Sequence, residues 1–177
     1  MIWNPKAECM SREEIEALQL VRLKETVQQV YEKNAHYRAK MEAIGLKPQD
    51  IQSLKDLAKM PFTVKDDLRQ TYPLGMLAVD KSEVVRLHGS SGTTGKPIFV
   101  AYTKKDLDTW SELLARIISA AGVGKEDTAQ VAFNYGLFTG GFGLHYGLEK
   151  VGAAVVPMSG GNTQKQLMVM QDLGTTA

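Results

Sequence analysis

The sequence is nearly devoid of cysteine and poor in histidine. Cys9 is its only cysteine, so the chain has neither a disulfide framework nor a thiolate metal cluster. The three histidines, His36, His88 and His145, are far apart and show no spacing typical of zinc ligands. We therefore predict that this chain supplies no metal ligand.

Long apolar runs and an excess of charge of either sign are also missing. No stretch of about 18 apolar residues occurs, and the opening residues MIWNPKAECMSREE lack the apolar core of a signal peptide. The formal net charge is +1, from 21 Lys and Arg against 20 Asp and Glu spread along the chain. We expect a cytoplasmic protein whose partners are neither membranes nor nucleic acids.

What is present is the composition of a globular protein. The 177 residues are close to the usual size of one domain, and 44% of them are hydrophobic and 23% charged. Residues 1–80 and 81–177 differ in pattern. The pattern of residues 1–80 predicts helices, and that of residues 81–177 predicts an α/β arrangement.

Helix signals dominate residues 1–80. Ser11 followed by Glu14 is a capping box, which opens a helix that ends at Asn34. A shorter helix is expected over residues 36–44, closed by Gly45.

Two further short helices are expected within SLKDLAKMPFTVKDDLRQTYP, residues 53–73. Pro61 separates them, because proline interrupts a helix. Thr63 opens the second one, with Asp66 as its capping partner. The first part is therefore predicted to be a mainly helical segment.

Strand patterns begin after residue 80. EVVRLH and IFVAYT, residues 83–88 and 98–103, flank a glycine-rich loop and predict a strand-loop-strand unit. Thr103 with Asp106 forms another capping box, which opens a helix that ends at Gly122.

Strands and helices then alternate to the end of the chain. The expected elements are a strand AQVAFNY (129–135), a helix GFGLHYGLEKVG (141–152), a strand AAVVPM (153–158) and a helix TQKQLMVMQDLG (163–174). Alternation of this kind is typical of parallel βαβ units in a doubly wound α/β sheet. The closing residues DLGTTA complete no element at the point where another strand is expected, so we expect the chain to be a fragment.

The stretch HGSSGTTGKPIFVAYT, residues 88–103, contains the most distinctive loop. Three glycines, two serines, two threonines and one lysine lie between residues 89 and 97. A loop that binds phosphate needs glycines that turn the backbone N–H groups inward, hydroxyl donors and a cation. The predicted phosphate ligands are Ser90, Ser91, Gly92, Thr93, Thr94, Gly95 and Lys96.

Two other interpretations of this loop are possible. The P-loop of nucleoside triphosphatases, G-x-x-x-x-G-K-[ST], is disfavoured because Ser90 replaces its first glycine and Pro97 follows Lys96. A P-loop also opens a helix, whereas KPIFVAY predicts a strand. A hairpin without a ligand is the usual account of a glycine-rich loop, but seven consecutive residues of this chemistry favour phosphate.

NYGLFTGGFG, residues 134–143, is the second candidate site. Apolar residues after a strand are usually core. These residues, however, follow the carboxyl end of an expected strand, where open α/β sheets bind ligands. Gly140 and Gly141 have no side chains, so they would leave space for a ligand at the start of the predicted helix. His88 is a further candidate for a phosphate contact, whereas His145 and the turn over residues 159–162 are interpreted as structural.

The sequence also resembles a known family. SSGTTGKP, followed by a strand that ends in YT, resembles the phosphate-binding signature of the adenylate-forming acyl-CoA synthetase superfamily. With PFTVKDDLRQTYP, VVRLHGSSGTTGKP, YTKKDLDTW and NYGLFTGGFGLHYGLEKVGAAVVPMSGGNT, the chain resembles the phenylacetate-CoA ligase family from about Pro5 to its end. The fold this implies is part of the large N-terminal domain of an adenylate-forming enzyme.

The resemblance implies a function. Such an enzyme uses ATP to join phenylacetate, or a related small aryl acid, to coenzyme A through an acyl-adenylate. Residues 90–96 would hold the β- and γ-phosphates, with Lys96 as the catalytic countercharge. The aryl ring would lie against Tyr135, Phe138, Gly140 and Gly141. The resemblance also implies a homodimer as one possible assembly.

The resemblance has one departure, which is length. Complete members of the family are much longer, and their Tyr-Gly-x-Thr-Glu segment, which helps hold Mg²⁺, has no counterpart within these 177 residues. The same holds for their ribose-binding aspartate, hinge and C-terminal lysine. We therefore expect the N-terminal part of the ligase, with an incomplete nucleotide-binding portion over residues 81–177, and no activity from this part alone. The alternative is a stand-alone phosphate- or nucleotide-binding module without catalysis.

Overall fold

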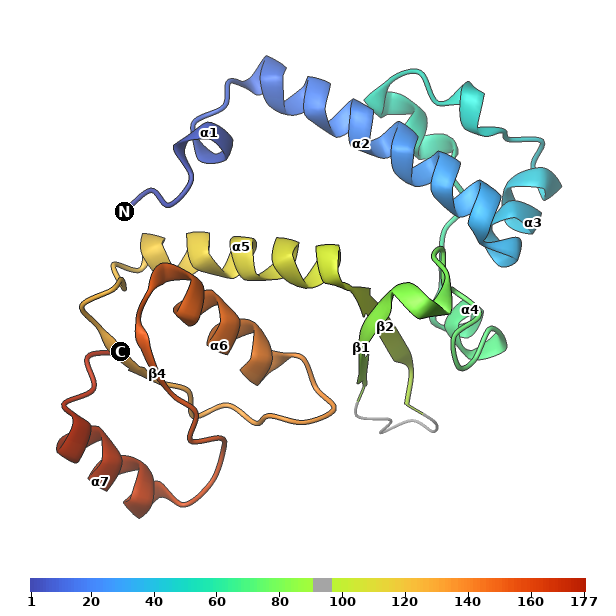
Figure 1. Ribbon diagram of the computed structural model, residues 1–177. Coiled ribbons are helices and arrows are strands. Elements are labelled where there is room, and N and C mark those ends of the chain that lie inside the picture. The colour runs from blue at the N-terminus through green and yellow to red at the C-terminus, as the bar shows by residue number, and fades with distance from the viewer. Residues whose placement is uncertain (91–96) are drawn as a thin grey trace.

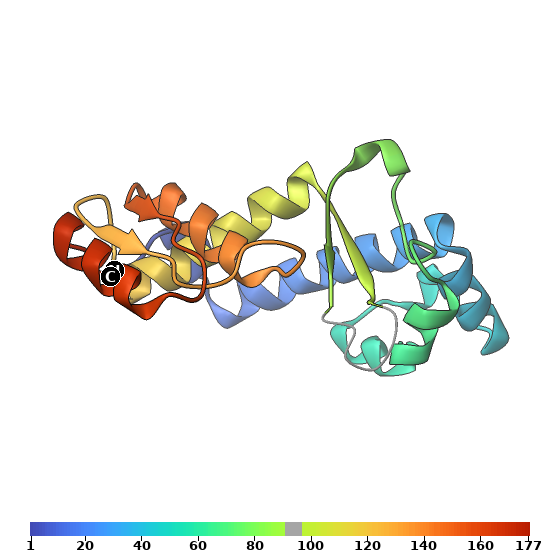
Figure 2. The same cartoon turned by 90° about the horizontal axis from the view of Figure 1, so that it is seen from below.

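The computed structural model describes residues 1–90 and 97–177. Figure 1 shows a helical part from α1 to α4 and a second part built on α5, α6 and α7, with the β1 and β2 strands between them. The turned view in Figure 2 shows that the molecule is elongated and that these two strands lie near its middle. None of the described helices is both long and apolar enough to cross a membrane.

Helices account for most of residues 1–83. They are α1 (Pro5–Glu8), α2 (Arg12–Lys33), α3 (Ala35–Ala43), η1 (Pro48–Asp50), η2 (Leu54–Lys59), α4 (Lys65–Gln70) and η3 (Lys81–Glu83), the η elements being 3₁₀ helices. A core of buried side chains packs α2 against α3 and against the residues around η1 that follow α3. It consists of Val27, Met41, Leu46 and Ile51.

The start and end predicted for α2 are confirmed. The Ser11 hydroxyl accepts a hydrogen bond from the amide of Glu14 at 3.2 Å, and the Glu14 carboxylate accepts from the amide of Ser11 at 2.7 Å. Asn34 ends α2 and also caps α3, because its side-chain oxygen accepts from the amide of Tyr37 at 2.9 Å. These reciprocal bonds satisfy amides that a helix start leaves free.

The predicted start of α4 is wrong by one residue. Asp67, not Asp66, closes the first turn, and its carboxylate accepts from the amide of Val64 at 2.7 Å. The N-cap position falls on Val64, and the Thr63 hydroxyl bonds the Tyr37 hydroxyl. Asp66 instead faces solvent and pairs with Arg69 at 2.8 Å.

The two strands predicted on either side of the glycine-rich segment are confirmed. β1 (Val84–Gly89) pairs antiparallel with β2 (Phe99–Thr103), with His88 opposite Val100 and Gly89 opposite Phe99. α5 (Lys104–Ala120) then begins at the expected capping box, where the Asp106 amide donates to the Thr103 hydroxyl at 3.2 Å.

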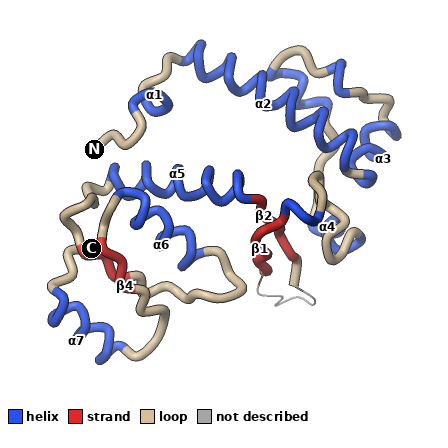
Figure 3. Tube along the Cα trace, in the orientation of Figure 1, coloured by secondary structure: helices blue, strands red, loops and turns tan. Residues whose placement is uncertain are grey.

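A parallel βαβ unit is also confirmed, although its strands are short. β3 (Thr128–Gln130) and β4 (Ala154–Val156) pair in parallel and are joined through α6 (Gly140–Val151). The β1–β2 and β3–β4 pairs belong to separate two-stranded sheets. Figure 3 shows how little of the chain these strands occupy beside the helices.

The strand expected over residues 129–135 is wrong in its second half. The ladder ends where the Val131 amide donates to the Val156 carbonyl at 2.9 Å. The next bond of a regular ladder would join the Met158 amide to the Val131 carbonyl, but the Met158 amide donates to the Val156 carbonyl at 3.0 Å and the Ser159 amide takes its place on Val131 at 3.1 Å. Residues beyond Val131 therefore leave the sheet and form a loop that leads to α6.

Residues after α7 (Thr163–Leu173) lie along the other edge of β3. The Ala177 amide donates to the Thr128 carbonyl at 3.3 Å, and the Ala177 carbonyl accepts from the Gln130 amide at 2.8 Å. This is the bonding pattern of parallel strands. Of DLGTTA, Asp172 and Leu173 thus end α7, and Thr176 and Ala177 lie beside β3 in the place of a third strand.

Two glycines allow α5 and α6 to pack closely. A Cβ atom on Gly143 would lie 2.7 Å from a ring carbon of Trp110, and one on Gly147 would lie 2.5 Å from the Cβ of Leu114. Only residues without side chains fit at these positions. The core under this helix pair consists of Ala115, Ile118, Ala129, Val131, Leu148, Val151 and Ala153.

Candidate functional site

The base of the glycine-rich loop is held by its first residue. Ser90 donates its amide to the Ile98 carbonyl at 2.9 Å, and its hydroxyl accepts from the Ile98 amide at 3.0 Å. Ser90 is therefore bonded to the chain that enters β2. The other predicted phosphate ligands lie outside the described residues; they are Ser91, Gly92, Thr93, Thr94, Gly95 and Lys96.

The loop that carries the second candidate site contacts the end of β1. The Leu137 carbonyl accepts from the Gly89 amide at 2.9 Å and is 3.0 Å from His88 Nδ1. The contact is close, because a Cβ atom on Gly89 would lie 2.9 Å from Leu137 Cδ2. The root of the predicted phosphate loop, at Gly89, thus meets the loop before α6, which carries the predicted aryl contacts. They meet at the carbonyl of Leu137.

His88 lies in an aromatic environment. It is 3% exposed, and its ring is 5.6 Å from those of Tyr102 and Phe142 and 6.0 Å from that of Trp110, measured between centroids. Its Nε2 atom is buried and has no hydrogen-bond partner among residues 1–90 and 97–177. His88 is therefore held by β2, α5 and α6, and its one polar contact within these residues is with Leu137.

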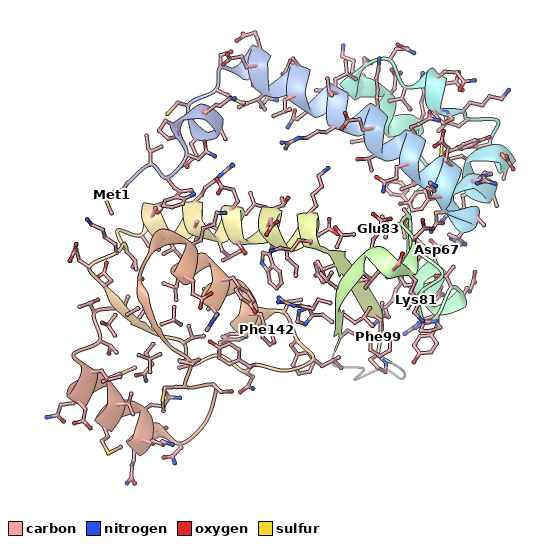
Figure 4. All side chains as sticks on the ribbon, in the orientation of Figure 1. Met1, Asp67, Lys81, Glu83, Phe99 and Phe142 are labelled. Atoms are coloured by element: carbon pink, nitrogen blue, oxygen red, sulfur yellow. The ribbon has the colours of Figure 1, made fainter. Side chains whose placement is uncertain are left out.

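Arg86 lies on the same face of β1 as His88. Its guanidinium stands 5.2 Å from the ring of Phe142 and 4.8 Å from that of Tyr146, and it donates to the Tyr146 hydroxyl at 3.1 Å. Stacking of this kind stabilises a cation away from water. Figure 4 shows Phe142 on the side of α6 that faces the β1–β2 pair.

Tyr135 is turned toward α6. Its hydroxyl is 3.2 Å from His145 Nδ1, and His145 Nε2 is 3.1 Å from a carboxylate oxygen of Glu149. Burial raises the pKa of Tyr135, and the charge of Glu149 raises it further. The sequence assigned His145 a structural role; its spacing of four residues from Glu149 was the signal for this chain of three polar side chains.

The other predicted aryl-site residues lie around the start of α6. Phe138 is 44% exposed. Gly140 packs against the ring of Phe133, and a Cβ atom on Gly141 would lie 2.7 Å from the carbonyl oxygen of Asn134. Both glycines therefore let the preceding loop lie directly against the helix, and their contact with an aryl ring stays a prediction.

A cavity of about 800 Å³ lies elsewhere, between the segment that follows α4 and the junction of β2 with α5. Its lining includes Thr71, Pro73, Phe99 and Lys104. None of the predicted phosphate- or aryl-site residues within the described ranges lines it. The cavity is therefore separate from the contact at Leu137.

The fold belongs to a class of CoA-ligating enzymes. A crystal structure of 2-hydroxyisobutyryl-CoA ligase in complex with 2-HIB-AMP and CoA matches it with a TM-score of 0.86 and 31% identity, over 96% of this chain and 37% of that one. No protein-family model matches the chain. The structural likeness identifies the fold of adenylate-forming CoA ligases.

Sequence comparison narrows the class to one family. The phenylacetate-coenzyme A ligase of Aromatoleum evansii is 56% identical over 162 residues, which cover 92% of this chain and 37% of that protein. The phenylacetate-coenzyme A ligase of Escherichia coli (strain K12) is 50% identical over 175 residues, 97% of this chain and 40% of that protein. The chain belongs to the phenylacetate-CoA ligase family and spans about two fifths of the length of these relatives.

Proposed function

We propose that this chain is part of an ATP-dependent ligase that joins phenylacetate, or a related aryl acid, to coenzyme A. The observation that carries the proposal is the Leu137 carbonyl of the loop before α6, which accepts from the Gly89 amide at the root of the glycine-rich loop and lies 3.0 Å from His88 Nδ1. A ligase that activates a carboxylate with ATP needs its nucleotide and acid sites side by side. The identity with two phenylacetate-coenzyme A ligases supports the choice of acid.

The reaction proceeds in two displacements. A carboxylate oxygen attacks the α-phosphorus of ATP, the bond to the β-phosphate oxygen breaks, and pyrophosphate leaves. The sulfur of coenzyme A then attacks the acyl carbon, AMP leaves with the electron pair of the acyl–oxygen bond, and the thiol proton is released. The first step places negative charge on the departing pyrophosphate, so positioned donors and cations lower its barrier.

The glycine-rich loop supplies such donors. In the proposal the hydroxyls and amides of residues 90–95 bind the β- and γ-phosphates, and Lys96 neutralises the charge of the leaving group. A lysine ammonium is a compact charge on a flexible stem, which suits a group that moves as it departs. Ser90 anchors this loop through its two bonds with Ile98.

The aryl ring is assigned to the loop before α6. In the proposal it contacts Tyr135 and Phe138, and Gly140 and Gly141 leave it room at the helix start. The half-buried Tyr135 offers an apolar ring with a hydroxyl that is already bonded to His145. A flat aryl acid suits such a wall better than a long acyl chain does.

Magnesium is assigned outside the described part of this chain. Within residues 1–90 and 97–177 no three His, Cys, Asp or Glu side chains gather so that they could hold a metal ion. The donor set of these described residues does not fit the ion. Its ligand, the ribose contacts and a homodimeric assembly all belong to the proposed complete ligase.

The test is phenylacetate-dependent exchange of pyrophosphate into ATP by the complete polypeptide that carries these residues. Lys96→Ala and Ser91→Ala are expected to abolish most of this exchange, because each removes a ligand of the leaving phosphates. Lys55→Ala, at an exposed lysine of η2, is the matched control and is expected to keep it. Exchange that survives both loop substitutions, or that ignores phenylacetate, contradicts the proposal.

The 177-residue chain alone separates this function from a stand-alone nucleotide-binding module. As part of a ligase it lacks assigned ribose contacts, so calorimetry with ATP is expected to show little heat and no phenylacetyl-CoA is expected to form. Tight binding of ATP by the isolated chain supports the module instead. Formation of phenylacetyl-CoA by it contradicts the assignment of essential residues elsewhere.

A further inference from the structure

We propose that His88 is a positioning residue that couples the aryl-acid site to the ATP phosphate site through the carbonyl of Leu137. The inference rests on the proposed function and names a residue that acts through another. Its basis is a shared acceptor, because two consecutive residues of β1 bond the same oxygen.

In the hydrogen bond between His88 and Leu137, the chemistry of the Leu137 carbonyl determines which atom is the donor. A carbonyl oxygen only accepts hydrogen bonds, and it has two lone pairs with which to do so. Nδ1 of His88 therefore carries a proton and donates it at 3.0 Å, beside the Gly89 amide, which donates at 2.9 Å. Both acceptor positions of the Leu137 carbonyl are then occupied.

His88 is held firmly on its other sides. Its backbone lies in the β1–β2 ladder opposite Val100, and its buried ring stands edge-on to Trp110 and Tyr102. A side chain that is 3% exposed and surrounded by rings has few rotamers open to it. It can therefore transmit the position of β1 to the residue that it bonds.

The backbone of the loop that receives this bond makes few other hydrogen bonds, although the Tyr135 side chain is held by His145 and Phe142. Across Tyr135–Phe138 the carbonyl of Leu137 is the one backbone group that bonds another described backbone group outside a helix or strand ladder. Tyr135 and Phe138, the predicted aryl contacts, flank it within two residues. A shift of the Leu137 carbonyl would therefore move the predicted aryl wall.

The other end of the connection is the phosphate loop. Gly89 precedes Ser90 directly, so the peptide that bonds Leu137 leads into the predicted phosphate ligands. Ligands bound on either side of one shared contact bias the same local arrangement. By linkage, each ligand then changes the affinity of the other by the same factor.

A packing role alone makes a different prediction. If His88 only fills space, its replacement lowers stability and leaves the mutual effect of the two ligands unchanged. If it positions Leu137, replacement without a donor reduces that mutual effect in a protein that is still folded. The ratio of two dissociation constants separates the roles.

The experiment measures phenylacetate binding to the complete polypeptide by calorimetry, with and without α,β-methylene-ATP, which cannot release pyrophosphate. The coupling factor is the dissociation constant for phenylacetate without the nucleotide divided by the one with it. For the wild type we expect a factor above one. His88→Leu removes the donor and is expected to lower the factor by roughly threefold to tenfold, the effect of one buried hydrogen bond. A wild-type factor of one overturns the proposal.

His88→Asn is the matched variant, because its amide nitrogen lies close to the position of Nδ1 and can still donate to Leu137. It is expected to retain most of the coupling, whereas His88→Gln, whose amide reaches toward the position of Nε2, is expected to lose it. Equal coupling in all three variants, or equal loss in Asn and Leu variants that both keep their circular dichroism, overturns the positioning role.

Two further readouts keep the test decisive. If His88→Leu is unfolded, the His88→Gln variant and the Nδ1 proton shift of the wild type decide the matter. Phenylacetate alone is expected to move that shift, and an unmoved shift counts against the proposal. Wild-type protein without phenylacetate-dependent exchange refutes the proposed function itself, whereas active protein with unchanged coupling in His88→Leu refutes only this inference.

Discussion

The carboxylate of Asp67 lies 2.7 Å from the ammonium of Lys40 and 3.0 Å from Nε2 of His36, so α4 is bound to α3 through one acidic side chain. Figure 4 shows Asp67 between these helices. The same carboxylate caps α4 at Val64. Asp67 is 8% exposed, and removal of one member of a buried charged network leaves the others unpaired.

This network predicts an acid dependence of stability. The hydrogen bond from Lys40, followed by that from the Val64 amide, lowers the pKa of Asp67 to about 2, against about 3.9 in an unfolded chain. Because the folded-state pKa is the lower one, the stabilisation is complete above about pH 4 and is lost as the pH falls toward 2. Asp67→Asn is expected to lower the urea midpoint at pH 7 and to flatten its fall between pH 5 and 2.

Asp66→Asn is the control for this prediction. Asp66 stands next to Asp67 but is largely exposed and pairs with Arg69 at 2.8 Å. An exposed pair of this kind contributes little to the free energy of unfolding. The urea midpoint of the Asp66→Asn variant should therefore follow that of the wild type at each pH. Equal acid profiles for the Asp67→Asn variant and the wild type contradict the prediction.

The packing of α5 on α6 predicts that Gly147→Ala is destabilising. Alanine favours a helix over glycine by nearly 1 kcal/mol, but its Cβ would lie 2.5 Å from the Cβ of Leu114 and 2.8 Å from a methyl of Ile118. Overpacking costs about 1–3 kcal/mol, so we expect the free energy of unfolding to fall. Leu144→Ala, at a partly exposed position of the same helix, is expected to change it less. A stabilised Gly147→Ala variant contradicts the close packing.

The chain of Tyr135, His145 and Glu149 predicts a change in the titration of the phenol. Glu149→Gln removes the negative charge that contributes to the raised pKa of Tyr135, so that pKa should fall. It should stay above its ordinary value, because burial is the larger cause and is unchanged. NMR titration of ring-labelled tyrosine measures it, with Glu126→Gln at an exposed site as the control. An unchanged Tyr135 titration contradicts the contact through His145.

Local signals in the sequence were the reliable ones. The boxes at Ser11 and Thr103 depend on residues three positions apart, and both formed as expected. The box expected at Thr63 failed because the N-cap falls one residue later, at Val64, and the Thr63 hydroxyl bonds Tyr37 of another helix instead. A pattern confined to four residues contains no information about such a competitor.

Features that join distant residues were beyond sequence reasoning. The bond between His88 and Leu137 spans 49 positions, and no local pattern indicates it. The expected strand through Tyr135 failed for a related reason, because the length of a strand depends on its neighbour, and β4 loses its regular register where the Met158 amide bonds the Val156 carbonyl. The family resemblance predicts which segments form the site, whereas the contact between these segments through one carbonyl is visible only in the fold.

β3 acquires its two neighbours late in the order of the chain. Its partners are β4, which begins at Ala154, and the residues around Ala177, so both stand downstream of it. α2 and α3, by contrast, are adjacent in sequence and share a core of their own. Contacts between distant residues form more slowly than local ones because longer loops must close. During synthesis the helical part can therefore be complete while β3 still emerges without either neighbour.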